Sequence, residues 1–191
     1  EVSYQREYFI SYPANVMAIR YKASRPGKQN LVFSYAPNPV STGKMVADGK
    51  NGLLWDARLD NNDMQYAIRI RAINKGGSLS NEGGKLTVKG ADEVVFLISA
   101  DTDYKANNNP DYNDPKTYVG VDPLATTQDW VSKAEGKGYV EALAFDEAYR
   151  SFFGVFVLIR FHRISLQEKR CLHGYCHPRK HLLYRLGKIT F

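Results

Sequence analysis

The chain has 191 residues, of which 43% are hydrophobic and 24% charged, and this balance predicts one sizeable domain with a packed core. No apolar run approaches the ~18 residues of a membrane span, which excludes a transmembrane helix. No membrane partner is expected either. The net charge of +6 is concentrated in residues 151–191, which hold eight Lys and Arg but one acid, Glu168, so we expect no nucleic-acid partner.

Short strands separated by Gly, Pro and Asn turns are predicted throughout the first hundred residues. The clearest covers 63–73, where apolar residues such as Ile68 and Ile70 alternate with Arg69 and Arg71. Strict alternation of this kind predicts one buried face and one solvent-facing side. The high aromatic content, 13% of the chain, also favours β structure, because aromatic rings pack well on a pleated surface.

Another strand is predicted over 93–100, where the sequence is almost continuously apolar, as for a strand buried on both faces. A mixed polar and aromatic stretch over 3–12 opens the series. The other predicted strands cover 16–23, 31–35, 53–59 and 86–88. Several strands at such short spacing predict a mainly β chain folded as an antiparallel β-sandwich.

Residues 101–123 form a long predicted loop that is rich in turn formers. Its aspartates are Asp101, Asp103, Asp111, Asp114 and Asp122. They allow three interpretations: a calcium site, since hard cations prefer several oxygen ligands, a solvated or helix-capping loop, and the rim of a sugar site. The EF-hand pattern fails, because Lys105, Ala106 and Tyr112 stand where oxygen ligands and a glycine are required.

Two helices are predicted after this loop. Thr127 is predicted to cap the first, which carries Val131 and Ala134 at helical spacing and ends near Gly136. The second is predicted over roughly 139–153. Strands followed by helices indicate a β domain that ends in a helical linker.

The last segment, residues 154–191, has a different chemistry. It holds both cysteines, Cys171 and Cys176, and all four histidines of the chain. These are zinc-ligand types, but the spacing of the cysteines, with histidines between and beside them, does not match a zinc finger. Basic residues interleaved with tyrosines also suit nucleic-acid contact, although a charge run is usually just solvated. We expect no metal site and no cofactor.

Six stretches of the chain form an ordered set of motifs. They are 6–20 (REYFISYPANVMAIR), 30–35 (NLVFSY), 59–62 (LDNN), 90–97 (GADEVVFL), 100–104 (ADTDY) and 114–123 (DPKTYVGVDP). In this order they resemble the N-terminal domain of glycoside hydrolase family 95, the α-L-fucosidase family. The resemblance covers about residues 4–154, and it is specific because of the order rather than because of any single motif.

The resemblance implies an N-terminal β-supersandwich, a helical linker, an (α/α)6 barrel and a C-terminal β domain. In this chain it implies part of the sandwich over 1–125, one or two linker helices over 126–153 and a divergent basic tail over 154–191. The linker motif YRSFFG at 149–154 is followed by sequence unlike the family. We therefore expect a truncated chain with a reading-frame slip near Gly154, which leaves the catalytic barrel unencoded.

The family cleaves α-L-fucosidic and, in some members, α-L-galactosidic bonds through residues of that barrel. The resemblance thus implies a secreted or periplasmic glycoside hydrolase, although we expect no signal peptide in this chain. It also implies that the chain is a non-catalytic N-terminal domain, which has no catalytic residues and is inactive. The alternative is a free-standing carbohydrate-binding β-sandwich. Unpaired strand edges also predict self-association. The candidates for contact with a fucosylated or related glycan are Asn61, Asn62, Asp101, Asp103 and Tyr104.

Overall fold

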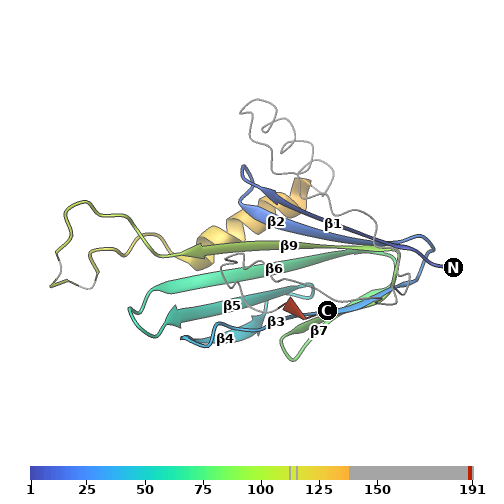
Figure 1. Ribbon diagram of the computed structural model, residues 1–191, viewed down its shortest axis with the longest axis horizontal. Helices are drawn as coiled ribbons and strands as arrows, with labels where there is room; N and C mark the ends of the chain where they lie inside the picture. Colours follow the sequence, from blue (N-terminus) through green and yellow to red (C-terminus); the bar gives the residue numbers. More distant parts are fainter. Residues whose placement is uncertain (112, 115, 138–188, 191) are drawn as a thin grey trace, which may run out of the picture.

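The computed structural model describes residues 1–111, 113, 114, 116–137, 189 and 190. The larger of its two sheets consists of β1 (Tyr4–Ser11), β2 (Val16–Ala23), β4 (Ser41–Ala47), β5 (Gly52–Leu59), β6 (Gln65–Lys75) and β9 (Glu93–Thr102). These strands lie in the order β1-β2-β9-β6-β5-β4 (Figure 1). All of the pairings are antiparallel.

The smaller sheet consists of β3 (Gln29–Tyr35), β7 (Ser78–Glu82), β8 (Lys85–Ala91) and β10 (Ile189–Thr190), in the order β10-β3-β8-β7. Its pairings are also antiparallel. The predicted antiparallel β-sandwich is therefore confirmed. Among the described residues no helix has the length and hydropathy that crossing a membrane requires. Pairing between strand edges of two copies stays a prediction.

The main core lies between the two sheets. Ile19, Ile70 and Phe96 of the larger sheet belong to one buried cluster with Phe33 and Leu86 of the smaller sheet. The rings of Phe33 and Phe96 stack across the interface with their centroids 4.8 Å apart. Stacked aromatic pairs contribute beyond the apolar area that they bury, so this contact helps to hold the sheets face to face.

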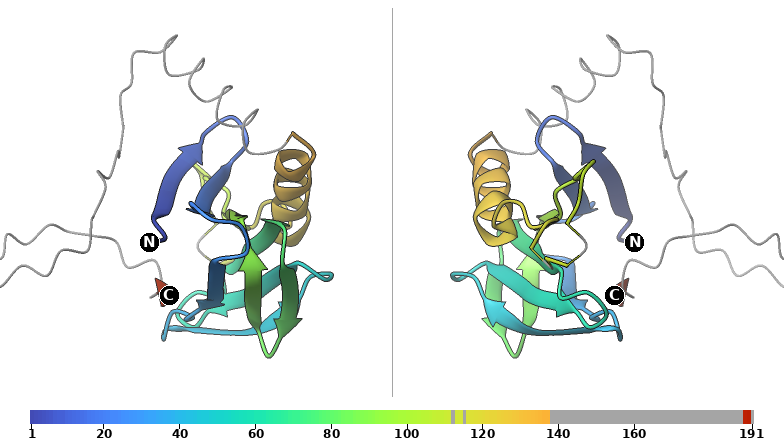
Figure 2. Two further views of the ribbon diagram at one scale, coloured as in Figure 1. Left: turned by 90° about the vertical axis from the view of Figure 1, so that its right-hand side faces the viewer. Right: turned by 90° about the vertical axis from the view of Figure 1, so that its left-hand side faces the viewer.

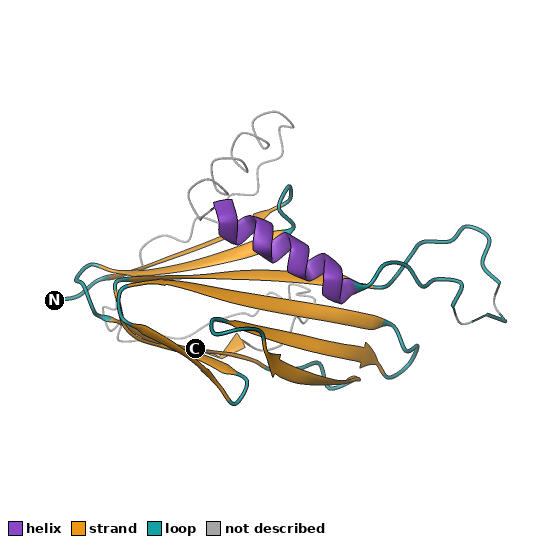
Figure 3. Ribbon diagram, turned by 180° about the vertical axis from the view of Figure 1, so that it is seen from behind, coloured by secondary structure: helices purple, strands orange, loops and turns teal. Residues whose placement is uncertain are grey.

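A helix over 123–137 covers the outer face of the six-stranded sheet (Figures 2 and 3). Val131 and Ala134 of the helix form a second buried cluster with Val95 and Leu97 of β9. Because side chains alternate along a strand, the residues between them point into the main core. The prediction that 93–100 is buried on both faces is thereby confirmed for most of its length.

Asp122 and Pro123 begin this helix. The side chain of Asp122 accepts a hydrogen bond of 2.9 Å from the amide of Leu124, as an N-cap residue does, and proline is favoured at the first helical position. The prediction that Thr127 caps the helix is therefore wrong. Thr127 is fully buried one turn further on, and its hydroxyl donates to the carbonyl of Pro123 at 2.8 Å.

Three chain segments cross between the sheets at one end of the sandwich, joining β2 to β3, β6 to β7 and β8 to β9. Asp92 ties them together, and we call this end the Asp92 corner. Its carboxylate accepts from the amide of Gly27 at 2.7 Å, its amide donates to the carbonyl of Lys75 at 2.8 Å, and its carbonyl accepts from the amide of Ala23 at 3.0 Å. A fourth crossing, residues 36–40 between β3 and β4, lies at the opposite end.

The outer face of β6 does not face solvent, and that part of the alternation prediction is wrong. The side chains of Arg69 and Arg71 are only 7% and 11% exposed. The carboxylate of Asp48 lies 2.7 Å from Arg69 and 3.0 Å from Arg71, and Glu135 of the covering helix lies 3.6 Å from Arg71. Guanidinium groups can be buried in this way because carboxylates compensate their charge.

Three strands of the fold, β4, β7 and β10, are absent from the sequence prediction, whereas the predicted strands are all present. Each is an edge strand. In β4 and β7 exposed polar residues such as Lys44 and Ser80 leave little apolar alternation in the sequence. The second predicted helix, over 139–153, and nearly all of the tail lie outside the described residues. The proposed domain boundaries therefore stay predictions.

Candidate functional site

A groove opens at the end of the sandwich opposite the Asp92 corner, between the two sheets. Its volume is about 410 Å³, within the usual range of roughly 300–1,000 Å³ for small-molecule sites. The smaller sheet and the crossing after it contribute Tyr35 and Asn38. The larger sheet contributes Leu59, Tyr66 and Thr102, and the turn between β5 and β6 contributes Met64. Both sheets must therefore be in place for the groove to exist.

Two tyrosines line this groove, Tyr35 and Tyr66, and both contact Trp55; we call these three side chains the aromatic wall. The ring of Tyr35 lies against that of Trp55, with centroids 5.9 Å apart and an interplanar angle of 50°. The indole nitrogen of Trp55 donates to the hydroxyl of Tyr66 at 2.9 Å, and that hydroxyl donates to Ser41 Oγ at 2.7 Å. Because each member contacts its neighbour, this network restricts the movement of the three aromatic side chains.

Tyr35 is the electrostatically most distinctive residue of the groove. Burial raises the pKa of its phenol to about 12, and the neighbouring hydroxyl of Tyr66 adds to this effect. The phenol of Tyr35 is therefore neutral at all physiological pH values. Among the described residues, its hydroxyl forms no hydrogen bond, so it remains able to donate to and accept from a ligand.

Polar groups complete the lining. Asn38 Oδ1 accepts from the amide of Val40 at 3.2 Å, which leaves the side-chain NH2 group without an acceptor in the described part of the chain. Thr102 Oγ1 accepts from the amide of Tyr104 at 3.3 Å and can still donate its own hydrogen. Asp101 also lines the groove, although alternation along β9 directs its side chain to the face opposite that of Thr102.

Of the five predicted sugar-contact residues, only Asp101 lines this groove. Asn61 and Asn62 are exposed in the turn between β5 and β6, and the side chain of Asn62 accepts from the amide of Met64 at 3.1 Å. The turn lies near the groove, since Leu59 and Met64 on either side of it line the groove. A ligand role for the two asparagines stays a prediction.

Asp103 and Tyr104 have different environments. Asp103 is only 8% exposed, and its carboxylate accepts from the amide of Gln65 at 3.1 Å, so it has a structural partner. Tyr104 is 57% exposed and stacks on Tyr118, with ring centroids 6.0 Å apart. The structure thus gathers the predicted residues at one end of the larger sheet but does not bring their side chains around one point.

The loop after β9 projects from the sandwich (Figure 1). Its aspartates accept from nearby backbone amides: Asp111 from Asn113, Asp114 from Lys116 and Asp122 from Leu124. Among the described residues, no group of three or more potential ligands is placed to hold a metal ion. The hydrogen bonds favour the turn- and helix-capping interpretation of this loop over the calcium interpretation.

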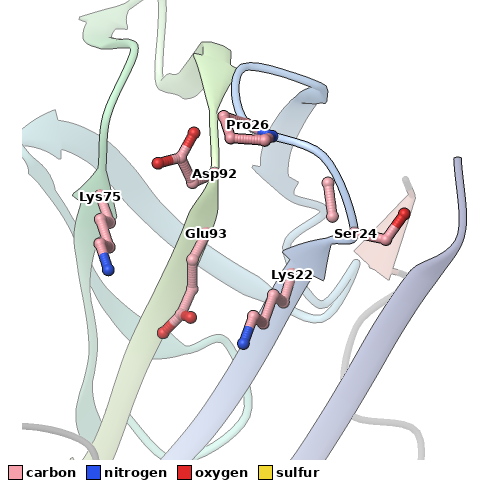
Figure 4. A pocket seen from close by; sticks show the side chains of 7 residues that line it. Lys22, Ser24, Pro26, Lys75, Asp92 and Glu93 are labelled. Atoms are coloured by element: carbon pink, nitrogen blue, oxygen red, sulfur yellow. The ribbon is translucent and has the colours of Figure 1, made fainter.

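A second, smaller hollow of about 220 Å³ lies at the Asp92 corner (Figure 4). Figure 4 shows the side chains of Lys22 and Lys75 on either side of Glu93. Glu93 on β9 is directly opposite Lys22 on β2 and directly opposite Lys75 on β6. Glu93 also lies 2.8 Å from Arg20, and this hydrogen bond raises the pKa of the Arg20 guanidinium. The carboxylate is therefore already compensated, and the arrangement stabilises neighbouring strands.

The groove residues Tyr35, Asn38 and Tyr66 are absent from the site predicted from the sequence. One sequence signal was present, because Tyr35 ends a strand and is followed closely by the turn Pro37-Asn38-Pro39. Aromatic and amide side chains at such a junction are suited to ligand contact. Their meeting with Tyr66 depends on the way in which the two sheets pack, which no local pattern reveals.

These features define a class of domain, namely an antiparallel β-sandwich with a helix on its larger sheet and an aromatic groove at one end. Residues 1–107 match the family model described as Glycosyl hydrolase family 65, N-terminal domain, and the chain belongs to this family. The protein thus contains the N-terminal β-sandwich domain of a glycoside hydrolase-family protein. A comparison with curated proteins finds no match.

Proposed function

We propose that this chain is the non-catalytic N-terminal domain of a glycoside hydrolase of family 95, the α-L-fucosidase family. Two observations agree and support the proposal. Residues 1–107 match a glycoside hydrolase N-terminal domain, and the six ordered motifs of the sequence resemble the N-terminal domain of family 95. The loop and the Asp122-Pro123 helix start, which follow that match, contain the last of these motifs.

The distribution of carboxylates supports a non-catalytic role. Inverting glycosidases use two carboxyl groups about 6.5–9.5 Å apart across the scissile bond. Asp101 is the one carboxylate among the groove-lining residues in the described part of the chain. At the smaller hollow, the carboxylate of Asp92 accepts a hydrogen bond from the amide of Gly27, and that of Glu93 forms an ion pair with Arg20. We therefore assign no hydrolytic step to these side chains.

Two measurements test the proposal. The purified chain should release no product from nitrophenyl α-L-fucoside or nitrophenyl α-L-galactoside, and turnover that persists after repurification would overturn the non-catalytic assignment. The coding DNA around and beyond codon 154 should contain, after a one-base change of frame, a sequence that encodes an (α/α)6 barrel. DNA without such a frame in any register would overturn the assignment to a fucosidase-type enzyme.

A second candidate function is that of a free-standing carbohydrate-binding module. The groove favours it, because an aromatic wall with unsatisfied hydroxyl and amide groups is available without a catalytic pair. A glycan array separates the two candidates. Micromolar binding of the isolated chain to a defined glycan favours the binding module, whereas a domain that accompanies a barrel needs no such affinity.

A further inference from the structure

We propose that the groove between the sheets is a binding subsite for one neutral pyranose ring, with Tyr35 as the residue on which the ring stacks. The ligand class rests on the proposed function in carbohydrate metabolism, but the position of the site rests on the groove itself. The volume of about 410 Å³ suits one ring with its substituents.

The chemistry of the lining matches the two faces of a sugar ring. A pyranose presents C–H groups on its faces and hydroxyl groups around its rim. The C–H face is slightly positive and packs on the electron-rich face of an aromatic ring. The hydroxyl groups require both donors and acceptors, which the Tyr35 hydroxyl, the Asn38 amide and the Thr102 hydroxyl provide.

The groove also selects against charged ligands. Its lining contains no lysine, arginine or histidine in the described part of the chain, so an anionic sugar has no cation to pair with. The phenol of Tyr35 stays protonated at physiological pH, as its environment already shows. Aliphatic side chains such as Leu59 and Ile68 line the same space and would accept the methyl group of a 6-deoxy sugar.

The groove is preorganised, which lowers the entropic cost of binding. Tyr35 is held against Trp55, and Trp55 is held by Tyr66 and Ser41 through successive hydrogen bonds. A ligand therefore does not have to order the aromatic wall. A single ring still buries little area, so we expect the dissociation constant of a monosaccharide to lie in the millimolar range.

The two tryptophans of the chain make a direct test available, because Trp55 contacts the groove residues Tyr35 and Tyr66, whereas Trp130 lies in the helix on the far side of the larger sheet. The Trp130→Phe variant of the full chain leaves Trp55 as the only indole. Its fluorescence is titrated with methyl α-L-fucoside, methyl α-L-galactoside and methyl α-D-glucoside. We expect a saturable change with at least one glycoside, and a flat titration with all three overturns the proposal.

Substitutions in that background place the ligand. Tyr35→Ala should weaken binding about tenfold or more, since a lost aromatic contact is worth on the order of one factor of ten. Asn38→Ala, which changes no core residue, should weaken it several-fold. Tyr4→Ala, which changes a 56% exposed tyrosine at the other end of the larger sheet, should leave binding within about twofold. Circular dichroism checks that each variant is folded, and equal affinities of the Asn38 and Tyr4 variants would contradict the assigned site.

These results separate the subsite from the proposed function. If the glycosides fail to bind but the DNA encodes a barrel in the shifted frame, the subsite is wrong and the enzyme assignment stands. If the glycosides bind but no barrel frame exists, the subsite stands and the free-standing binding module replaces the enzyme assignment.

Discussion

The carboxylate of Asp48 lies 2.7 Å from the guanidinium of Arg69, and the same oxygen lies 3.0 Å from Arg71. One exposed turn thus supplies the counter-charge for two arginines beneath the helix. Arg69 also donates to the carbonyl of Leu124 in the first turn of that helix, at 3.2 Å. Asp48 therefore fixes the arginine that connects the helix to the sheet.

Asp48→Asn should lower the free energy of unfolding by about 3 kcal/mol, because removing one partner leaves buried charges uncompensated. Urea denaturation followed by circular dichroism measures this loss. Asp63→Asn is the matched control, since Asp63 pairs with Arg58 in solvent, with side chains 81% and 50% exposed. It should cost less than about 1 kcal/mol, and equal losses from the two variants would contradict the role of Asp48.

Gly77→Ala should destabilise the fold for two separable reasons. Gly77 has a φ of 65°, and a Cβ there would lie 2.3 Å from the carbonyl oxygen of Lys89. Gly83 has a φ of 56° but open space around a Cβ, so Gly83→Ala carries only the cost of the left-handed conformation, about 1–2 kcal/mol. In thermal denaturation the melting temperature of Gly77→Ala should lie clearly below that of Gly83→Ala. Similar melting temperatures would show that β8 moves aside freely.

Stability should fall at high pH in a way that depends on Tyr35. The pKa of Tyr35 is about 12 in the folded chain against an ordinary value of 10.0, so the folded state holds this proton more tightly. Its contribution is complete below pH 10 and is lost as the pH rises toward 12. Urea denaturation across this range should show a declining free energy of unfolding. Tyr35→Phe should make the decline shallower without abolishing it, because burial also raises the pKa of the Tyr21 phenol. An equally steep decline in Tyr35→Phe and in the unaltered chain would contradict the role of Tyr35.

Phe96→Ala should be among the most damaging core substitutions. Phe96 is 0% exposed and stacks on Phe33 of the other sheet, so the change opens a cavity at the interface between the sheets. We expect a loss of about 3–5 kcal/mol in the free energy of unfolding. Val32→Ala, at a position 43% exposed, should cost no more than about 0.5 kcal/mol, and a comparable cost at both positions would place the core elsewhere.

Much of the fold could be predicted from the sequence because period-two alternation is a local property. The stretch around Ile68 and Ile70 identified β6 and its core face correctly. The same alternation misassigned Arg69 as exposed, because hydropathy cannot distinguish an arginine in water from one paired with Asp48 under a helix. The start of that helix was predictable from Asp122 and from the proline after it, but Thr127 matched the same cap preference.

The groove could not be predicted, for a different reason. Tyr35 and Tyr66 belong to different sheets, and their approach depends on how those sheets pack. The loop over 101–123 allowed a calcium site or a sugar rim as interpretations because several aspartates lie close together in its sequence. In the structure, Asp111 and Asp114 bind backbone amides two residues further on, which is what aspartate commonly does in turns.

The position of the Asp92 corner affects the spacing of residues at the opposite end of the sandwich, where the groove opens. In the described part of the chain, three segments join the sheets at Asp92, whereas residues 36–40 join them at the end where the groove opens. From Lys75 to Tyr66, β6 covers about 30 Å at ~3.3 Å per residue. Because of this length, a small tilt between the sheets at the Asp92 corner would produce a larger displacement between Tyr35 and Tyr66. A substitution of Asp92 would therefore alter the spacing of groove residues that lie at the far end of the sandwich.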